Sequence, residues 1–211
     1  MPRLIHISLA RDEEYCVENM LKSILPYVEA SYVLVDGRSR DRTEEILLDH
    51  GCVVDKFSFE NFGKTSNTLL KWANDKGDWR IFLPPDELIV GDFGEKMISV
   101  VESLHTTDID GVHYPRKNWL DLEMTKHSGV YPDWQLRLCR LDFPRIHYVN
   151  YVHEIPIGLR KTIHVNEDTH HLCLYWKDKF NKSGDKLDLY KKLQHIQRED
   201  IKKGINNIWP D

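Results

Sequence analysis

The sequence predicts an α/β fold, in which helices flank a central, mixed but mostly parallel β-sheet within a single domain. Apolar runs of strand length alternate with segments of helical period through the first half of the chain. Repeated β–α units of this length require parallel strands with right-handed crossovers. The 211 residues are 41% hydrophobic and 30% charged, which suits one globular domain with a sizeable core.

The first half of the chain supplies most of the regular elements. Residues 4–9 form a near-continuous apolar run, as expected for a strand covered on both faces. A helix is expected from the acidic residues 12–14 to Pro26, because apolar residues recur there at helical spacing. The same alternation then predicts strands at 32–35, 52–54 and 79–83, and helices at 43–48 and 65–74.

The second half is less regular. It predicts a helix at 97–104, strands at 111–114 and 135–140, and an amphipathic helix at 186–201 that packs on the body of the domain. Residues 117–130 have weak periodicity and many polar side chains, so we expect a loop over a cleft there.

A pair of carboxylates follows the fourth predicted strand. The strand must end at Pro84 and Pro85, because proline cannot donate to a sheet ladder, and Asp86 and Glu87 come next. Carboxylates past the carboxyl end of such a strand suit a divalent cation and a phosphate. The alternative is that Asp86 lies in a plain turn or caps a helix that begins near Asp92.

A second strand ends in a carboxylate at Asp36. This side chain is expected to face the cleft and accept hydrogen bonds from a base or ribose. Asp41 and Thr43, further along the same loop, are expected to cap the next helix. The loop also carries three arginines, of which at most one is expected to contact phosphate.

Composition excludes several classes of protein. The net charge of −5 argues against a nucleic-acid-binding surface. The apolar runs are too short to cross a bilayer, and the N-terminus lacks the features of a signal peptide, so we expect no membrane insertion and a cytoplasmic location. The four cysteines are scattered and form no metal-type pair, which indicates reduced thiols.

Five segments, in order, carry a family resemblance. Residues 33–46 (VLVDGRSRDRTEEI) resemble the "VVDgGSTDGTeeI" segment of GT-A glycosyltransferases of the family 2 type. Residues 7–14 resemble the family's opening strand and "RNEE" turn, and residues 77–87 resemble "GDWiLfLDADE". Residues 131–138 and 152–154 resemble "yPDWQlRLfR" and "vHE". The resemblance covers about residues 4–155, and it implies a GT-A, Rossmann-like fold.

The resemblance implies transfer of a sugar from a nucleotide-diphosphate donor, a UDP-sugar, to a hydroxyl of a glycan or similar acceptor. The resemblance also divides the domain into two halves. Residues from about 1 to 105 would form a nucleotide-binding half, and residues from about 106 to 211 would form an acceptor half that includes the C-terminal helix. Further domains of a longer chain are compatible with the resemblance. Ala10 and Arg11 would hold the uridine, with Asp36 on the nucleoside.

The family's metal-binding "DxD" motif is incomplete in this sequence. Pro84 stands at the first aspartate position, so Asp86 alone would bind the metal and the donor phosphates. His153 is the candidate for a second protein ligand, and the alternative is an ordinary hydrogen-bonded histidine. Such a mixed shell suits Mn²⁺, with Mg²⁺ as the weaker alternative.

The resemblance assigns the remaining site residues. Asp133 would be the general base of an inverting enzyme, although it could instead only turn the chain after Pro132. Trp134 would stack on a sugar or lie in the core, and Arg137 would bind a donor phosphate or a carboxylate such as Asp78. Further nucleotide contacts are expected at Arg38, Lys64, Asn67 and Pro85, and further sugar contacts at Asp78, Gln135 and Glu154.

Two other functions are compatible with parts of the sequence. Pro84 supports a degenerate module that binds a nucleotide-sugar or glycan without turnover. A sugar-nucleotide pyrophosphorylase would share the α/β core, but residues 9–12 lack the glycine-rich, basic loop that such an enzyme needs. His170 and His171 have no partners at zinc spacing and are expected to be structural.

Overall fold

The computed structural model describes residues 1–120, 123–124, 131–172 and 184–203. The helices are α1 (Val17–Ile24), α2 (Thr43–Asp49), α3 (Phe62–Ala73), α4 (Phe93–Leu104) and α6 (Gly184–Lys202), with a 3₁₀ turn η1 at Leu25–Tyr27. The strands of the first half are β1 (Leu4–Ala10), β2 (Ser31–Asp36), β3 (Val53–Phe57), β4 (Trp79–Phe82) and β5 (Glu87–Leu88). Those of the second half are β6 (Ile109–Leu120), β7 (Glu123–Met124), β8 (Asp133–Arg140), β9 (His147–Val149), β10 (Ile155–Ile157), β11 (Lys161–His164) and β12 (Thr169–Leu172).

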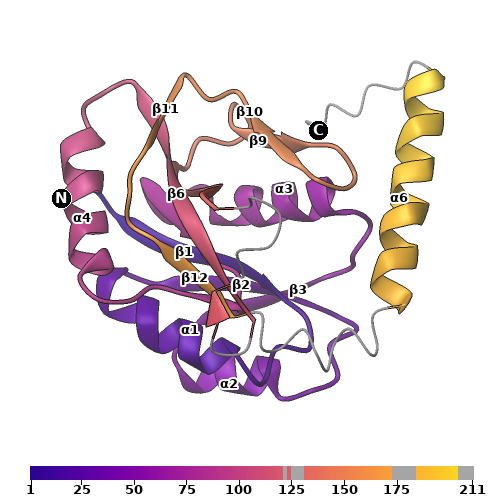
Figure 1. The fold of residues 1–211 in the computed structure, drawn as a ribbon, viewed down its shortest axis with the longest axis horizontal. Coiled ribbons are helices and arrows are strands. Elements are labelled where there is room, and N and C mark those ends of the chain that lie inside the picture. The colour runs from indigo at the N-terminus through magenta and orange to yellow at the C-terminus, as the bar shows by residue number, and fades with distance from the viewer. Residues whose placement is uncertain (121–122, 125–130, 173–183, 204–211) are drawn as a thin grey trace.

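One mixed sheet organises the described residues. Its order is β3-β2-β1-β4-β8-β6-β12-β5, with β7 and β11 also paired to β6. Strands β9 and β10 form a separate ribbon (Figure 1). The pairs β1–β2, β2–β3 and β1–β4 are parallel, as the alternating pattern of the sequence predicts. The predicted α/β fold is therefore confirmed.

The sheet brings distant parts of the chain to one edge. Strand β8 is antiparallel to both β4 and β6, so β6 runs in the same direction as β4. The carboxyl ends of β1, β2, β4 and β6 therefore share an edge with Asp133, the first residue of β8. We call this the carboxyl edge.

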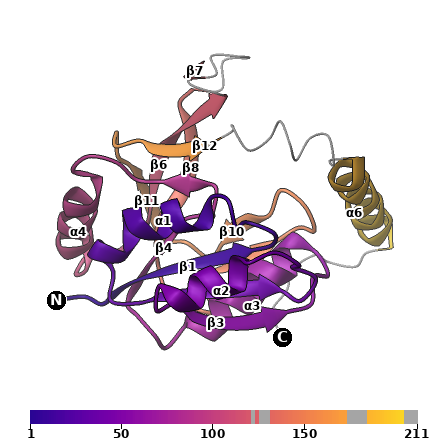
Figure 2. The same cartoon turned by 90° about the horizontal axis from the view of Figure 1, so that it is seen from below.

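Two apolar clusters cover the two faces of the sheet. Helices α1 and α4 pack through Leu21 and Met97 against one face, in a cluster that includes Trp79 and Leu138. Helix α3 packs through Leu69 against the other face. Figure 2 shows α1 and α3 on opposite sides of β1. This layering leaves the carboxyl edge to the connecting loops.

Helix α1 starts later than predicted. Its first residue is Val17, because the acidic residues before it serve the neighbouring loop. The backbone N–H groups of Asp12, Glu13 and Glu14 donate to side chains of the β2–α2 loop, at Ser39, Thr43 and Asp41 respectively. The prediction that Asp41 and Thr43 cap α2 is wrong, because Arg42 is the N-cap of this helix and its side chain makes no capping hydrogen bond. Thr43 N does donate to the Asp41 carboxylate over 3.0 Å, directly before the helix.

Helices α3 and α4 start earlier than predicted. Asn61 is the N-cap of α3, and its side chain accepts a hydrogen bond from the backbone N–H of Lys64 over 2.9 Å. Asp92 is the N-cap of α4, so Asp86 does not cap that helix. Asp86 lies in the turn between β4 and β5.

The predicted loop at 117–130 is wrong for its first residues. Strand β6 continues to Leu120, and its Arg116 lies opposite Asp133 of β8. A proline at position 115 lowers the strand signal, because it removes a donor from the ladder. Residues 123–124 form β7, and the other predicted loop residues from 121 to 130 lie outside the described part of the chain.

The C-terminal amphipathic helix is confirmed. Leu189, Tyr190 and Leu193 of α6 join a cluster with Tyr151, Val152, Phe59 and Phe62. The Tyr151 hydroxyl also donates to Asp200 over 2.6 Å. Figure 1 shows α6 upright beside the β9–β10 ribbon. The helix therefore packs next to the turn that joins β9 to β10.

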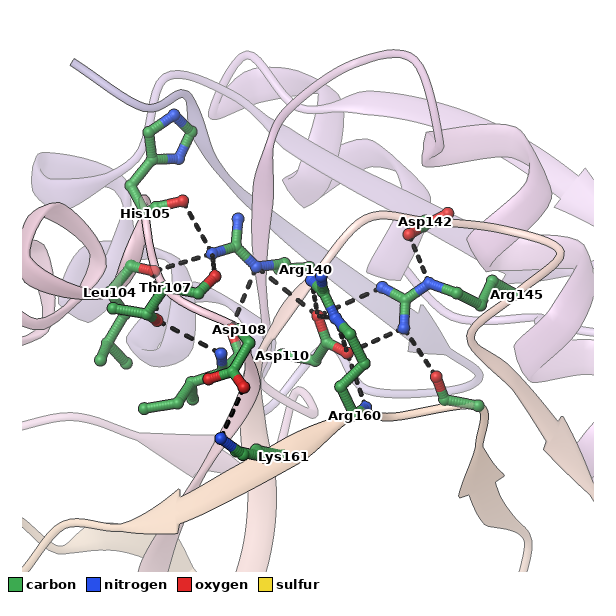
Figure 3. Close-up of polar contacts among 12 residues, drawn as sticks. Leu104, His105, Thr107, Asp108, Asp110, Arg140, Asp142, Arg145, Arg160 and Lys161 are labelled. Carbon is green, nitrogen blue, oxygen red and sulfur yellow. Dashed lines mark hydrogen bonds and ion pairs between the residues drawn. The ribbon is translucent and has the colours of Figure 1, made fainter.

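A buried aspartate fixes the base of the β9–β10 ribbon. Figure 3 shows Asp110 of β6 accepting hydrogen bonds from Arg145, before β9, and from Arg160, after β10. Burial opposes ionisation of Asp110, but these two arginines outweigh it and hold the pKa of the carboxyl well below its usual range. Residues on both sides of the ribbon are thereby tied to the central sheet.

Within the described residues no helix is long and apolar enough to cross a membrane. Cys16, Cys52 and Cys139 are buried thiols that form no disulfide among the described residues, and Cys173 lies outside the described part of the chain.

Candidate functional site

Carboxylates from three separate segments reach the carboxyl edge. Asp36 is the last residue of β2, Asp86 follows β4, and Asp133 opens β8. Ala10 ends β1 as a buried residue, and the exposed Arg11 follows it. The charge of Arg11 is one of the influences that lower the pKa of Asp36. Four of the predicted nucleotide contacts, Ala10, Arg11, Asp36 and Asp86, therefore lie around the ends of β1, β2 and β4.

The carboxylate of Asp36 is already engaged by Arg38. Its Oδ1 accepts from the Arg38 backbone N–H and from Nε, each over 2.9 Å, and its Oδ2 accepts from Nη2 over 2.5 Å. Asp36 is only 3% exposed. Burial opposes ionisation, but the hydrogen bonds and charge of Arg38 outweigh it and lower the pKa of Asp36.

The Pro84–Pro85 turn sets the position of Asp86. The backbone N–H of Glu87 donates to the Pro84 carbonyl over 3.0 Å, which closes the turn directly after β4. Pro85 is buried, whereas Asp86 is half-buried. Glu87, by contrast, is buried, so the two adjacent carboxylates lie in different surroundings.

Glu87 belongs to a buried ion-pair network behind the site. Both of its carboxylate oxygens accept from Arg137 of β8, and Oε1 also accepts from Arg116 of β6 over 3.2 Å. The Glu87 side chain is wholly buried, and Arg137 is nearly so. The predicted pairing of Arg137 with a carboxylate is confirmed, but the partner is Glu87 and not Asp78, which lies beyond the other end of β4.

Asp133 is held by donors from two strands. Its Oδ2 accepts from Arg116 Nε over 2.9 Å and from Asn118 over 3.3 Å, and its Oδ1 accepts from Gln135 over 2.7 Å. Burial opposes ionisation, but the charge of Arg116 and these hydrogen bonds outweigh it and lower the pKa of Asp133. Asp133 is therefore ionised at neutral pH, and it is a weaker base than an ordinary aspartate.

The β9–β10 turn carries His153 and Glu154 against the start of α3. The backbone N–H of Phe62 donates to the Tyr151 carbonyl over 3.0 Å. A Cβ at Gly63 would overlap the Asn150 carbonyl, so only glycine permits this approach. His153 is exposed and has a positive φ of 53°. Burial raises the pKa of Glu154, whose carboxyl also bonds Ser66 of α3.

Helix α6 closes one side of this turn. The rings of Tyr190 and His153 have centroids 5.9 Å apart, and those of Tyr190 and Phe62 are 5.2 Å apart. The Glu154 carboxylate adds to the effect of burial in raising the pKa of Tyr190. Tyr190 was not a predicted site residue, because its position follows from packing between segments that are far apart in the sequence.

Two predicted contacts have structural partners. Asp78 lies at the amino end of β4, opposite the carboxyl edge, and accepts from the backbone N–H of Arg3 over 2.7 Å. Asn67 donates to and accepts from the backbone of Tyr148, over 2.9 and 2.7 Å, and so fastens α3 to β9. Neither residue belongs to the site proposed below.

Lys64 and Trp134, two other predicted contacts, each have a partner within the protein. Lys64 lies in the first turn of α3 and pairs with Glu60 over 2.7 Å. Trp134 is half-buried, and its ring meets that of His164 edge to face, with centroids 4.6 Å apart. His170 of β12 accepts a hydrogen bond at Nδ1 from the Trp119 indole over 3.1 Å, in keeping with its expected structural role.

The described residues hold no ready-made metal site. No group of three or more His, Cys, Asp and Glu side chains is arranged there to bind a metal ion. Asp86 is a single carboxylate, and Pro84 adds no ligand. These residues fit a cation that is shared with a bound diphosphate, since Mg²⁺-type ions are commonly held by one or two carboxylates together with substrate phosphates.

No protein-family model and no curated protein sequence match the chain. Solved structures do resemble it. A mycobacterial protein aligns with a TM-score of 0.57 and 16% identity, over 81% of this chain and 67% of that one. Glucosyl-3-phosphoglycerate synthase from Mycobacterium tuberculosis, in complex with Mn²⁺, UDP and glucosyl-3-phosphoglycerate, aligns with a TM-score of 0.54 and 17% identity, over 81% and 72% of the two chains.

The same synthase with Mg²⁺ and UDP aligns equally well, with a TM-score of 0.54 and 17% identity over 81% of this chain and 71% of that one. Likeness at this level of identity establishes the fold. The chain therefore has the GT-A fold that its sequence motifs predict.

Proposed function

We propose that this protein is a metal-dependent glycosyltransferase that moves a sugar from a nucleotide-diphosphate donor, a UDP-sugar, to a hydroxyl of a glycan or similar acceptor. One observation supports the proposal: within a GT-A fold, three separate segments place Asp36, Asp86 and Asp133 at the same carboxyl edge of the sheet. Ligands of open α/β sheets bind at this edge.

The nucleoside half of the donor lies at the ends of β1 and β2 in this proposal. Ala10, Arg11 and Asp36 contact the uridine, and Pro85 and Lys64 flank the diphosphate. Lys64 lies in the first turn of α3, where the helix dipole and the charge of the lysine both favour an anion. Asp86 faces the diphosphate from the turn after β4.

The reaction breaks the bond between the anomeric carbon and the diphosphate oxygen and forms a bond from that carbon to the acceptor oxygen. The acceptor hydroxyl loses its proton to a base, and Asp133 is the proposed base on the acceptor side. Trp134, Gln135 and Glu154 are proposed to line the space for the two sugars. Arg137 positions the site through Glu87 and does not contact the substrate.

Mn²⁺, or less favourably Mg²⁺, is the proposed cofactor. Asp86 would hold it together with the donor phosphates, and His153 of the β9–β10 turn is the proposed second protein ligand. A bound cation supplies Lewis-acid stabilisation of the charge that develops on the leaving diphosphate.

A binding module without turnover is the second candidate, favoured by the proline at position 84. Two measurements separate the candidates. Isothermal titration of UDP with Mn²⁺ tests the site, and Asp36→Ala should weaken the affinity several-fold in a folded protein. Release of UDP from a panel of UDP-sugars then tests turnover. UDP binding without any release, with or without acceptors, would favour the binding module.

A further inference from the structure

Arg38 lies where the proposed nucleoside must make its contact. Its guanidinium donates hydrogen bonds to both carboxylate oxygens of Asp36, and the Asp36 side chain is almost completely buried. The Arg38 side chain is itself half exposed, and its guanidinium carbon lies 5.4 Å from the centroid of the Phe59 ring. The arginine thus covers the carboxylate from the solvent side.

The occupied carboxylate has little acceptor capacity left. A carboxylate has about four lone-pair positions, and Oδ1 already receives two hydrogen bonds. Oδ2 receives the short bond from Nη2. Since Asp36 is almost completely buried beneath Arg38, a uracil or ribose reaches its carboxylate only when the Arg38 guanidinium moves away. The hydrogen bond from the Arg38 backbone N–H can stay.

We propose that Arg38 is a specificity-determining residue that makes this site select phosphorylated nucleosides over free nucleosides. The inference rests on the proposed function. When a nucleoside diphosphate binds, the guanidinium exchanges the Asp36 carboxylate for the diphosphate, and Asp36 becomes accessible to the nucleoside. Arginine pairs with phosphate as well as with carboxylate, in the same forked geometry.

A nucleoside without phosphate offers no such exchange. It must break a partly buried, charge-assisted, two-point contact and gives the arginine no new anion in return. A nucleoside diphosphate replaces one anionic partner by another. The difference in affinity between the two ligands therefore depends on Arg38. Only the phosphorylated ligand offers the guanidinium a new anionic partner in place of Asp36.

Titration of uridine and UDP against the whole protein, in the presence of Mn²⁺, tests the inference. In Arg38→Ala we expect tighter binding of uridine and weaker binding of UDP, so that the ratio of the two affinities falls by about tenfold or more. Arg38→Gln, which keeps a polar side chain of similar length, should show the same direction. Thermal unfolding checks that both variants are folded.

Arg42→Ala is the matched control, because Arg42 lies on the same loop and also grips a carboxylate with two nitrogens, at Glu45. It should leave the ratio unchanged. If UDP binds the natural protein but both Arg38 variants change the affinities for uridine and UDP by the same factor, the proposed role of Arg38 is refuted while the proposed function stands. If UDP does not bind the natural protein at all, both the proposed function and the proposed role of Arg38 are refuted.

Discussion

Arg137 of β8 and Glu87, the residue after Asp86, form a two-point ion pair inside the protein. Arg116 extends the pair to Asp133, through contacts of 3.2 Å to Glu87 and 2.7 Å to Asp133. The turn that carries Asp86 is thereby linked to the strand that carries Asp133. One network of ion pairs therefore connects the two halves of the proposed site.

Glu87→Gln should lower the free energy of unfolding by about 3–5 kcal/mol, because it leaves Arg137 buried without a charged partner. Urea unfolding at neutral pH measures the change. Glu95→Gln is the control: this exposed glutamate accepts one hydrogen bond, from Tyr27, and its loss should cost less than about 0.5 kcal/mol. Equal effects of the two substitutions would show that the buried pair adds nothing to stability.

Asp110→Asn should destabilise the protein in a pH-dependent way. We expect a loss of about 2 kcal/mol or more at neutral pH, less than for a wholly buried pair because Arg145 and Arg160 are partly exposed. The folded-state pKa of Asp110 lies below its unfolded value, so its contribution is complete above the unfolded pKa and is lost as pH falls through the folded pKa.

The measurement is the gap in unfolding free energy between the natural protein and Asp110→Asn at several pH values. The gap should be widest near neutral pH and should narrow steadily below about pH 4, where the unfolded carboxyl becomes protonated. Asp55→Asn, at an exposed position of β3, is the control and should show no such dependence. A gap that widens in acid would contradict the assignment.

Regular local patterns made most of the fold predictable from the sequence. The strands and helices of the first half follow apolar runs and helical periods, and their order alone implies parallel pairing. The start of α1 was missed because Asp12, Glu13 and Glu14 resemble a helix start but instead hold the β2–α2 loop. Local propensity cannot reveal a partner thirty residues away.

The site was only partly predictable for the same reason. The sequence identifies the carboxylates at strand ends, because strand direction alone sends them to one edge. It does not identify their partners: Asn67 bonds the backbone of Tyr148, and Arg137 bonds Glu87. These contacts depend on how α3, β8 and β9 pack, which no spacing within one segment encodes.

The two aspartates that flank β4 should differ sharply in nucleotide binding. Asp86→Asn should remove the Mn²⁺-dependent part of the affinity for UDP, a loss of about tenfold or more, because the cation loses its carboxylate. Asp78→Asn, at the opposite edge, should stay within about twofold of the natural protein. Titration with Mn²⁺ and again with EDTA measures both effects, and an EDTA-insensitive affinity in the natural protein would contradict the role of Asp86.

The environment of Asp133 predicts how it acts as a base. Three donors surround its carboxylate, and they lower its pKa even though burial acts in the opposite direction. The carboxylate must be deprotonated to accept a proton, and a lowered pKa keeps it deprotonated throughout the neutral range. The same lowered pKa weakens the pull on the acceptor proton.

Asp133→Asn should therefore bind UDP normally and transfer sugar about 10²-fold more slowly, at the lower end of the range for loss of a general base. In the natural protein, protonation of Asp133 should reduce kcat/KM only at a pH below the ordinary pKa of an aspartate. Between about pH 5 and pH 8, kcat/KM should therefore not change through titration of Asp133. Gln135→Ala removes one donor to Oδ1 and should raise the pH at which this reduction sets in, without abolishing transfer. Near-normal transfer by Asp133→Asn, or a product with retained anomeric configuration, would show that Asp133 only positions the acceptor through its contacts with Arg116 and Asn118.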